Sequence, residues 1–356
     1  MCIHDNDLLS PYHRTWRGID IDKGINSLSS SFCFFLLCAS SVNVFMLLSG
    51  YLGVSRSKRY SRIIELYLQT AFWSISIACL FFCIMPSYCV GYRIWHFIPL
   101  FTKYYWFFTS YFIVIFAMPS INHCVLTQGE HKNRLIIAIF FVLFCLVPEI
   151  STAGYHNFRG HAAFMLNDGF SPLWLGYMYY VGAFIGAYGV KALLPKKNNL
   201  CMNVTNPCVI LICIMIALTI SYFIQVLYTK FLLMFPKFHY IQPATVWCYN
   251  SPLNVIIAIL LLEFFRRLSI PHWQKTIIFG SRYSFGVFLI HCQYHLYEAM
   301  KGRFQWIGDF PMFAIPLVIS CAVSIFICCT VMDWGRDNIF KGIIFLRKKL
   351  SMFERI

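Results

Sequence analysis

Four basic residues lie within seven positions, directly after an apolar segment of the chain. Arg56, Lys58, Arg59 and Arg62 follow the stretch NVFMLLSGYLGVS, which begins at Asn43. Arginine offers a planar pair of donors that matches a phosphate group. If a helix continues through Arg59 and Arg62, their spacing of three places both side chains on one face. The cluster predicts either an anion-binding site or, more simply, a signal that orients a membrane protein.

A second set of polar residues lies near or inside other apolar stretches. Arg282, His291 and His295 fall in the segment 275–296, and the two histidines are four residues apart. On a continuous helix they share a face, so the three side chains can form a polar track, although structural histidines are the plainer interpretation. Glu263 precedes Arg266 by three residues, which predicts a local ion pair.

The composition excludes an ordinary soluble protein. Of the 356 residues, 59% are hydrophobic and only 12% are charged, and the mean hydropathy is +0.65. Soluble domains carry about 25% charged residues. The 16 cysteines fall mostly inside apolar stretches, and none forms a C-x-x-C pair with an accompanying histidine. We therefore expect a membrane protein without a bound metal ion.

Apolar segments long enough, or nearly long enough, to cross a bilayer recur along the whole chain. They cover residues 31–53, 63–87, 104–122, 135–149, 174–194, 207–229, 249–265, 275–296 and 312–332. The sequence thus predicts an all-α, polytopic membrane bundle of about nine complete transmembrane helices. Residues 1–356 form one domain, and 336–356 form a basic tail.

The basic residues predict the orientation. If the connections alternate between the two sides, most of the 29 Lys and Arg residues fall on the side of the Arg56–Arg62 cluster. That side is then cytoplasmic, and so is the tail. The net charge of +15 follows from this bias. The lipid bilayer is the expected partner, and no soluble basic face exists for a nucleic acid.

This orientation places residues 1–30 outside, with no signal peptide before them. The simplest interpretation is that Met1 lies inside a first transmembrane helix of which only a remnant is present. Unassisted export of a short N-terminal tail is the alternative.

Four stretches, taken in order, carry a resemblance to a known family. They are SVNVFMLLSGYLGV (41–54), YYWFFTSYFIVIFAMPSIN (104–122), YNSPLNVIIAILLLEFF (249–265) and SRYSFGVFLIHCQYHLY (281–297). Together they resemble membrane acyltransferase family 3, in particular its polysaccharide-modifying bacterial branch, over nearly the whole chain.

The resemblance implies a reaction. Family members transfer an acyl group, usually acetyl, from cytosolic acyl-CoA to a sugar hydroxyl, here of a cell-surface or exported glycan at a bacterial inner membrane. The family begins with a helix that carries an Arg and, about ten residues later, a catalytic His. MCIHDNDLLS resembles the end of that helix and matches His4 to this histidine. Because the preceding turns are absent, we expect a truncated and poorly active form.

His4 is then the candidate base, since a neutral imidazole accepts a proton near pH 7. It can alternatively accept the acyl group covalently. Asp7 shares a helix face with His4, whereas Asp5 points elsewhere, so Asp7 is the preferred orienting carboxylate. Arg59 and Arg62 match the family's R-x-x-R turn, and with Arg56 and Lys58 they would hold the phosphates of coenzyme A.

Two segments suggest where the acceptor binds. Tyr104, Tyr105 and Trp106 form either an aromatic belt at the membrane interface or a surface on which a sugar ring stacks. The loop 155–172 is rich in hydrogen-bonding groups and either shapes an acceptor site or is an ordinary exposed loop.

Two other functions remain open from the sequence. A transporter or polymerase of lipid-linked sugars would also be basic and rich in aromatic residues, but it would need arginines grouped on the outer side. A receptor or passive membrane module would not need the Arg59–Arg62 pair. Specific binding of coenzyme A distinguishes the acyltransferase from both.

Overall fold

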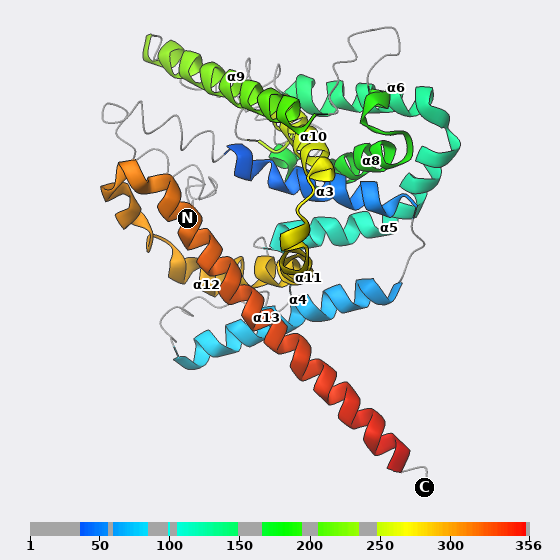
Figure 1. Cartoon of the computed structure of the whole chain (residues 1–356), viewed down its shortest axis with the longest axis vertical. Coiled ribbons are helices and arrows are strands. Elements are labelled where there is room, and N and C mark those ends of the chain that lie inside the picture. The colour runs from blue at the N-terminus through cyan, green and yellow to red at the C-terminus, as the bar shows by residue number, and fades with distance from the viewer. Residues whose placement is uncertain are drawn as a thin grey trace, which may run out of the picture.

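The computed structural model describes residues 36–55, 60–84, 99, 105–148, 166–193, 206–234 and 248–353, and all regular structure among them is helical (Figure 1). This agrees with the predicted all-α class. The α-helices are α3 (Ser41–Gly53), α4 (Tyr60–Ile84), α5 (Trp106–Thr127), α6 (Gly129–Phe141), α8 (Pro172–Tyr188), α9 (Pro207–Met234), α10 (Pro252–Arg267), α11 (Gln274–His291), α12 (Tyr294–Met300) and α13 (Ala314–Phe353). A π-helix, η7 (Val142–Leu146), continues α6, and short 3₁₀ turns cover Asn167–Gly169, Val190–Leu193, Pro271–Trp273, Gln305–Asp309 and Pro311–Phe313.

Each of the nine predicted apolar segments overlaps a helix, but fewer helices meet the requirements of a membrane span. Five do so within the described ranges: Leu36–Gly53, Ile63–Ile84, Trp106–Thr127, Pro207–Ile224 and Ala314–Gly342. The count of about nine complete spans is therefore not confirmed. The remaining segments form shorter or less apolar helices; α8 has 17 residues and α10 has 16. Multiple long apolar helices make this a multi-pass membrane protein.

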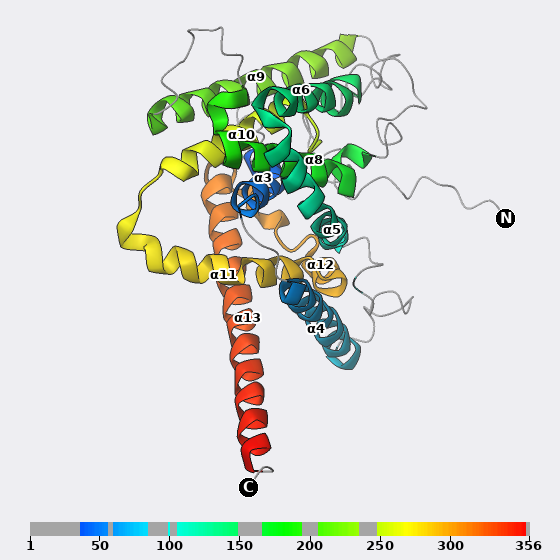
Figure 2. The ribbon, with the colours of Figure 1, turned by 90° about the vertical axis from the view of Figure 1, so that its right-hand side faces the viewer.

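The helices lie in three groups along the long axis of the molecule. Both views place α9 and α6 at one end, α3, α8 and α5 in the middle, and α4, α11 and α12 beyond them (Figures 1 and 2). One hydrophobic core joins α3, α5, α8 and α10, and a second joins α4, α5, α11 and α13. α5 therefore contributes to both cores.

The pair α3 and α8 packs backbone to backbone, because glycines line both helices. A Cβ atom at Gly50 would lie 2.1 Å from the carbonyl oxygen of Tyr179, and one at Gly182 would lie 2.1 Å from that of Leu47. Small residues that permit such close approach are typical of helix contacts in membranes.

These contacts also give the relative direction of the two helices. Gly182 packs against Leu47, and four residues later Gly186 packs against Tyr51. The residue numbers of the contacting pairs increase in the same direction along both helices, so α3 and α8 run parallel. The predicted alternation of the connections requires this same direction for segments 31–53 and 174–194.

The last helix is longer than its predicted span. α13 has 40 residues and continues without a break to Phe353, which corresponds to roughly 60 Å at 1.5 Å per residue. The predicted basic tail, 336–356, is therefore a continuation of the final helix as far as Phe353. In both views its C-terminal part extends away from the other helices (Figures 1 and 2).

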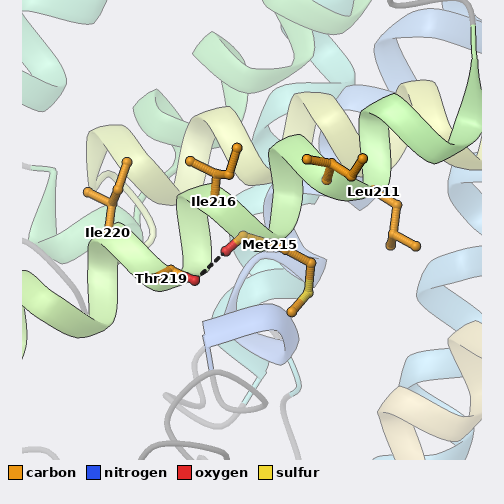
Figure 3. Close-up of a pocket in the computed structure, with 6 residues that line it drawn as sticks. Leu211, Met215, Ile216, Thr219 and Ile220 are labelled. Carbon is orange, nitrogen blue, oxygen red and sulfur yellow. Dashed lines mark hydrogen bonds between the residues drawn. The ribbon is translucent and has the colours of Figure 1, made fainter.

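The exposed surface of α9 is apolar and carries no group suited to catalysis in the hollow described here. A shallow hollow of about 350 Å³ is lined by one stretch of this helix, with Leu211, Met215, Ile216 and Ile220 around Thr219 (Figure 3). The Thr219 hydroxyl donates to the Met215 carbonyl at 2.8 Å. The hollow thus offers an apolar surface, as expected of a helix that faces lipid.

Candidate functional site

Most residues assigned to chemistry from the sequence lie outside the described ranges. They are His4, Asp7, Arg56, Lys58 and Arg59. Arg62 lies in the first turn of α4. Their proposed roles stay predictions.

The two histidines of the expected polar track do not share a helix. α11 ends at His291, and Gln293 has an extended backbone with ψ 134°. The Gln293 side chain then caps α12 by accepting from the backbone nitrogen of His295 at 2.8 Å. The expectation of one common face was therefore wrong, because this cap starts a new helix between the two residues. His291 Nδ1 lies 2.6 Å from the carbonyl of Val287 in its own helix.

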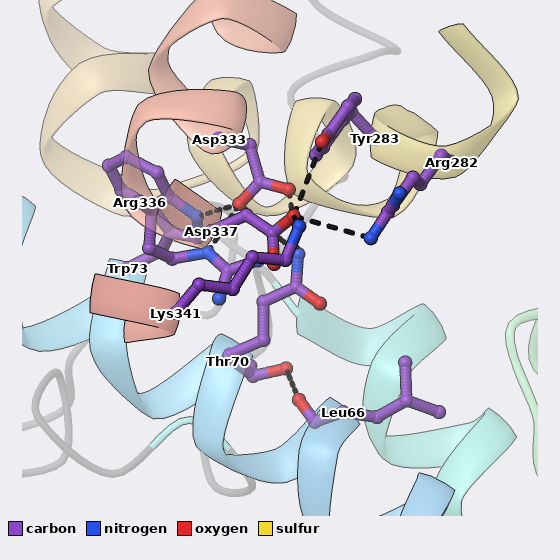
Figure 4. A network of polar contacts seen from close by, with 10 residues as sticks. Leu66, Thr70, Trp73, Arg282, Tyr283, Asp333, Arg336, Asp337 and Lys341 are labelled. Atoms are coloured by element: carbon purple, nitrogen blue, oxygen red, sulfur yellow. Dashed lines mark hydrogen bonds and ion pairs between the residues drawn. The ribbon is translucent and has the colours of Figure 1, made fainter. Parts of the chain in front are cut away.

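Arg282, the third member of that track, pairs with a carboxylate of α13. Asp337 accepts from Arg282 at 3.4 Å, from the Tyr283 hydroxyl at 3.3 Å and from Lys341 at 2.7 Å (Figure 4). One carboxylate therefore joins α11 to α13. These bonds give Arg282 a structural partner.

A second carboxylate lies one turn away and is almost fully buried. Asp333 is 1% exposed and accepts from Trp73 Nε1 at 2.8 Å, from Gln69 at 3.0 Å and from Arg336 at 2.6 Å (Figure 4). Gly286 makes room for it, since a Cβ there would lie 2.2 Å from the carboxylate carbon. A buried charge is tolerated when it is paired and hydrogen-bonded in this way. Asp333 thus ties α13 to α4.

A third polar cluster lies where α3, α8 and α10 begin, which we call the Asn43 end. Asn43 is fully buried and bridges two other elements. Its amide nitrogen donates to the Tyr249 carbonyl at 2.7 Å, and its oxygen accepts from Trp174 Nε1 at 3.0 Å. Ser171 starts α8 by accepting from the backbone nitrogen of Trp174 at 3.2 Å. One asparagine therefore sets the register of three helix starts.

Several departures from regular backbone geometry gather at this end. Asp168 has a left-handed conformation with φ 56°, and Gly169 follows with φ 91°. The Asp168 carbonyl accepts from the backbone nitrogen of Tyr249 at 3.0 Å. Asn250 donates to the Phe144 carbonyl, inside the π-helix η7, at 3.0 Å. Left-handed non-glycine residues and π-helical turns are both costly and concentrate at functional sites. The Asn43 end is therefore our candidate functional site.

The opposite end of α3, which we call the Tyr51 end, carries an arginine pair. Glu263 is 2% exposed and accepts two bonds of 2.8 Å from Arg266 and one of 2.7 Å from Arg267. The local pair predicted for Glu263 and Arg266 is thus confirmed. Tyr51 of α3 lies beside the Arg266 guanidinium. Two cations on one carboxylate leave an excess positive charge at this end. Arg56, the first residue of the basic cluster, follows Tyr51 by five positions in the sequence.

The chemistry available at each end differs. Among the described residues, the Asn43 end consists of amides, aromatic rings, the Ser171 hydroxyl and one carboxylate, Asp168, so it suits binding and positioning more than proton transfer. The Tyr51 end suits an anion. Within the part of the chain that the structure describes, no three His, Cys, Asp or Glu side chains are grouped so as to hold a metal ion.

Sequence reasoning found only part of the Asn43 end, because the loop 155–172 includes Asp168 and Ser171 but Asn43 itself was missed. Asn43 within an apolar helix was a usable signal, because burying an amide without hydrogen-bond partners costs free energy, so such a residue is expected to have partners. The dipeptide Asp168–Gly169 was another, because it favours left-handed turns. Trp174 and Tyr249 gave no signal, since only the folded chain places them beside Asn43.

Comparison with known proteins agrees with this architecture. A family model described as an acyltransferase domain, that of acyltransferase family 3, matches residues 11–334. Neither a curated protein nor a solved structure matches the chain. The matched region starts after His4 and Asp7, so it gives no support to their roles. Because it includes all helices from α3 to α12 and much of α13, the chain belongs to acyltransferase family 3.

Proposed function

We propose that this protein is a membrane O-acyltransferase that moves an acetyl group from cytosolic acetyl-CoA to a hydroxyl of a cell-surface or exported polysaccharide. A bacterial inner membrane is the proposed location. The observation that carries the proposal is the family match over residues 11–334. The positive charge at the Tyr51 end and the uncharged polar groups at the Asn43 end support it.

The reaction needs a base and a leaving group. In the proposed mechanism, neutral His4 takes the proton of the sugar hydroxyl while the oxygen of that hydroxyl attacks the thioester carbonyl. The C–S bond breaks, an ester forms, and the proton passes from the imidazolium to the departing CoA sulfur. Asp7 would hold the imidazole in the required orientation.

The donor would bind at the Tyr51 end. Coenzyme A carries a 3′-phosphate and a pyrophosphate, and guanidinium groups bind phosphate with paired donors. The proposed cationic groups are those predicted from the sequence, together with the pair that Glu263 holds: Arg56, Lys58, Arg59, Arg62, Arg266 and Arg267. Because Glu263 fixes the orientation of the last two, less side-chain entropy is lost when an anion binds to them.

The acceptor would bind at the other end of α3. Donor and acceptor then approach from opposite ends of one helix whose backbone packs directly on α8. Such rigid support fixes the distance between the two binding sites, and transfer then requires the thioester carbonyl and the sugar hydroxyl to meet between them at about 3–3.5 Å.

Binding of coenzyme A to the purified full chain in detergent tests the donor site. We expect saturable binding that the double variant Arg59→Ala/Arg62→Ala weakens by at least about tenfold, since charge-assisted bonds contribute about 1.5–3 kcal/mol each. Lys132→Ala is the matched control, because Lys132 is an exposed cation of another helix, α6. Equal binding by all three proteins would refute the donor site. No binding by any of them would favour the transporter or polymerase function instead.

A further inference from the structure

We propose that three aromatic rings at the Asn43 end form a subsite that binds a neutral sugar ring of the acceptor. The rings belong to Trp106, Phe170 and Tyr249, and Asp168 lies beside them in the chain. This inference rests on the proposed function and specifies the acceptor side of it.

The three rings come from separate parts of the chain and touch one another. Trp106 opens α5, Phe170 precedes α8, and Tyr249 precedes α10. Ring centroids are 4.5 Å apart for Trp106 and Phe170, 4.8 Å for Phe170 and Tyr249, and 5.7 Å for Trp106 and Tyr249. All three are half-buried, so each keeps part of its surface accessible.

Their position distinguishes them from an aromatic belt. Belt residues lie on the perimeter of a bundle, where they contact lipid head groups. The Tyr249 backbone instead joins the interior, because its carbonyl accepts from the fully buried Asn43. Trp106 and Tyr249 both pack against the core formed by α3, α5, α8 and α10. The rings therefore cover the end of that core.

The loop that carries Phe170 is held in one conformation. Asp168 is left-handed, and its carbonyl bonds to Tyr249 at 3.0 Å. A Cβ at Gly169 would lie 2.5 Å from the Cβ of Tyr249, so only glycine permits this approach. A costly backbone conformation persists only where its surroundings enforce it. The result is that Phe170 and the Asp168 backbone are fixed next to Tyr249.

The chemistry of these groups selects the ligand class. The C–H face of a pyranose ring is apolar and packs flat on aromatic rings, while its hydroxyls need hydrogen-bond acceptors and donors. The half-buried rings offer the apolar surface, and the half-buried side chain of Asp168, two residues before Phe170, offers a hydrogen-bond acceptor. Among the residues that the structure describes at the Asn43 end, none is basic, and a neutral sugar therefore suits these groups better than a phosphate or sialic acid. At the Tyr51 end, by contrast, Arg266 and Arg267 lie on Glu263.

The test uses the purified full chain in detergent and, as probe, an array of immobilised neutral oligosaccharides. We expect binding to at least one of them, and about a tenfold loss of affinity in Trp106→Leu, the upper range for one aromatic contact. Trp106→Phe should keep most of the affinity because it keeps a ring. Trp273→Leu is the control, since Trp273 is 62% exposed. It lies in the 3₁₀ turn Pro271–Trp273, which contributes no residue to the Asn43 end as defined above.

Coenzyme A binding, measured on the same samples, separates the possible failures. Glycan binding that Trp106→Leu leaves unchanged, or binding of anionic lipid head groups alone, would overturn the subsite. So would the absence of glycan binding while coenzyme A still binds. Loss of both in the wild-type chain would overturn the proposed function, and the subsite with it.

Discussion

One methyl group added at Gly50 tests whether α3 and α8 pack as closely as the structure shows. The Cβ of Gly50→Ala would lie 2.1 Å from the Tyr179 carbonyl oxygen and 2.6 Å from the backbone nitrogen of Ala183. Ordinary contacts are 3.4 Å or longer, so the helices would have to separate by more than 1 Å. Both obstacles are backbone atoms, and no change of rotamer relieves them.

The expected loss of stability follows from two opposing effects. Overpacking costs about 1–3 kcal/mol, and rigid backbone obstacles favour the upper value. Replacing glycine by alanine inside a helix recovers about 1 kcal/mol. The net loss is about 2 kcal/mol in the free energy of unfolding, or roughly a 30-fold change in the folding equilibrium.

Unfolding by titration with sodium dodecyl sulfate, followed by circular dichroism, measures this loss. Gly335→Ala is the matched control, because a Cβ at Gly335 would meet no described heavy atom within 4 Å. The control should be as stable as the wild type or more stable by about 0.5–1 kcal/mol. If Gly50→Ala unfolds like Gly335→Ala, the close approach of α3 and α8 is refuted.

The same titration tests three buried or capping groups. Asn43→Ala leaves the Trp174 indole and a backbone carbonyl without their partner, and should cost about 1–3 kcal/mol for each. Asp333→Ala removes the buried counter-charge of Arg336 and should cost about 3–5 kcal/mol. Gln293→Ala removes the cap of α12 and should cost about 1 kcal/mol.

Exposed Asp and Gln residues serve as controls for these variants. Asp309→Ala and Gln305→Ala lie in an exposed 3₁₀ turn and should change the free energy of unfolding by no more than about 0.5 kcal/mol. A variant at Asn43, Asp333 or Gln293 that is no less stable than these controls would contradict the corresponding hydrogen bonds.

Much of the fold was predictable because apolar segments must form helices in a bilayer. Each apolar segment does coincide with a helix. The number of membrane spans was not predictable, because polar residues interrupt and shorten the apolar runs. α10, for example, ends at an arginine pair after 16 residues. Gln293 broke the helix expected to hold His291 and His295, and capping by a side chain is hard to recognise inside an apolar run.

The candidate site was less predictable than the fold. The Glu263–Arg266 pair followed from local spacing and is present. Contacts between distant segments did not follow, as between Asn43 and Trp174 or between Asp333 and Trp73, because spacing along one helix says nothing of its neighbours. The partners of Arg282 were missed for the same reason. Family resemblance supplied the reaction that the residues alone left open.

The proposed reaction carries an acetyl group from one side of the membrane to the other. Its most direct test supplies radiolabelled acetyl-CoA to sealed membrane vesicles that contain the full chain, on the side of the Tyr51 end, with polysaccharide enclosed on the other. We predict alkali-labile label in the enclosed polysaccharide, and its loss in His4→Ala. Coenzyme A binding without any transfer of label to glycan would contradict the account.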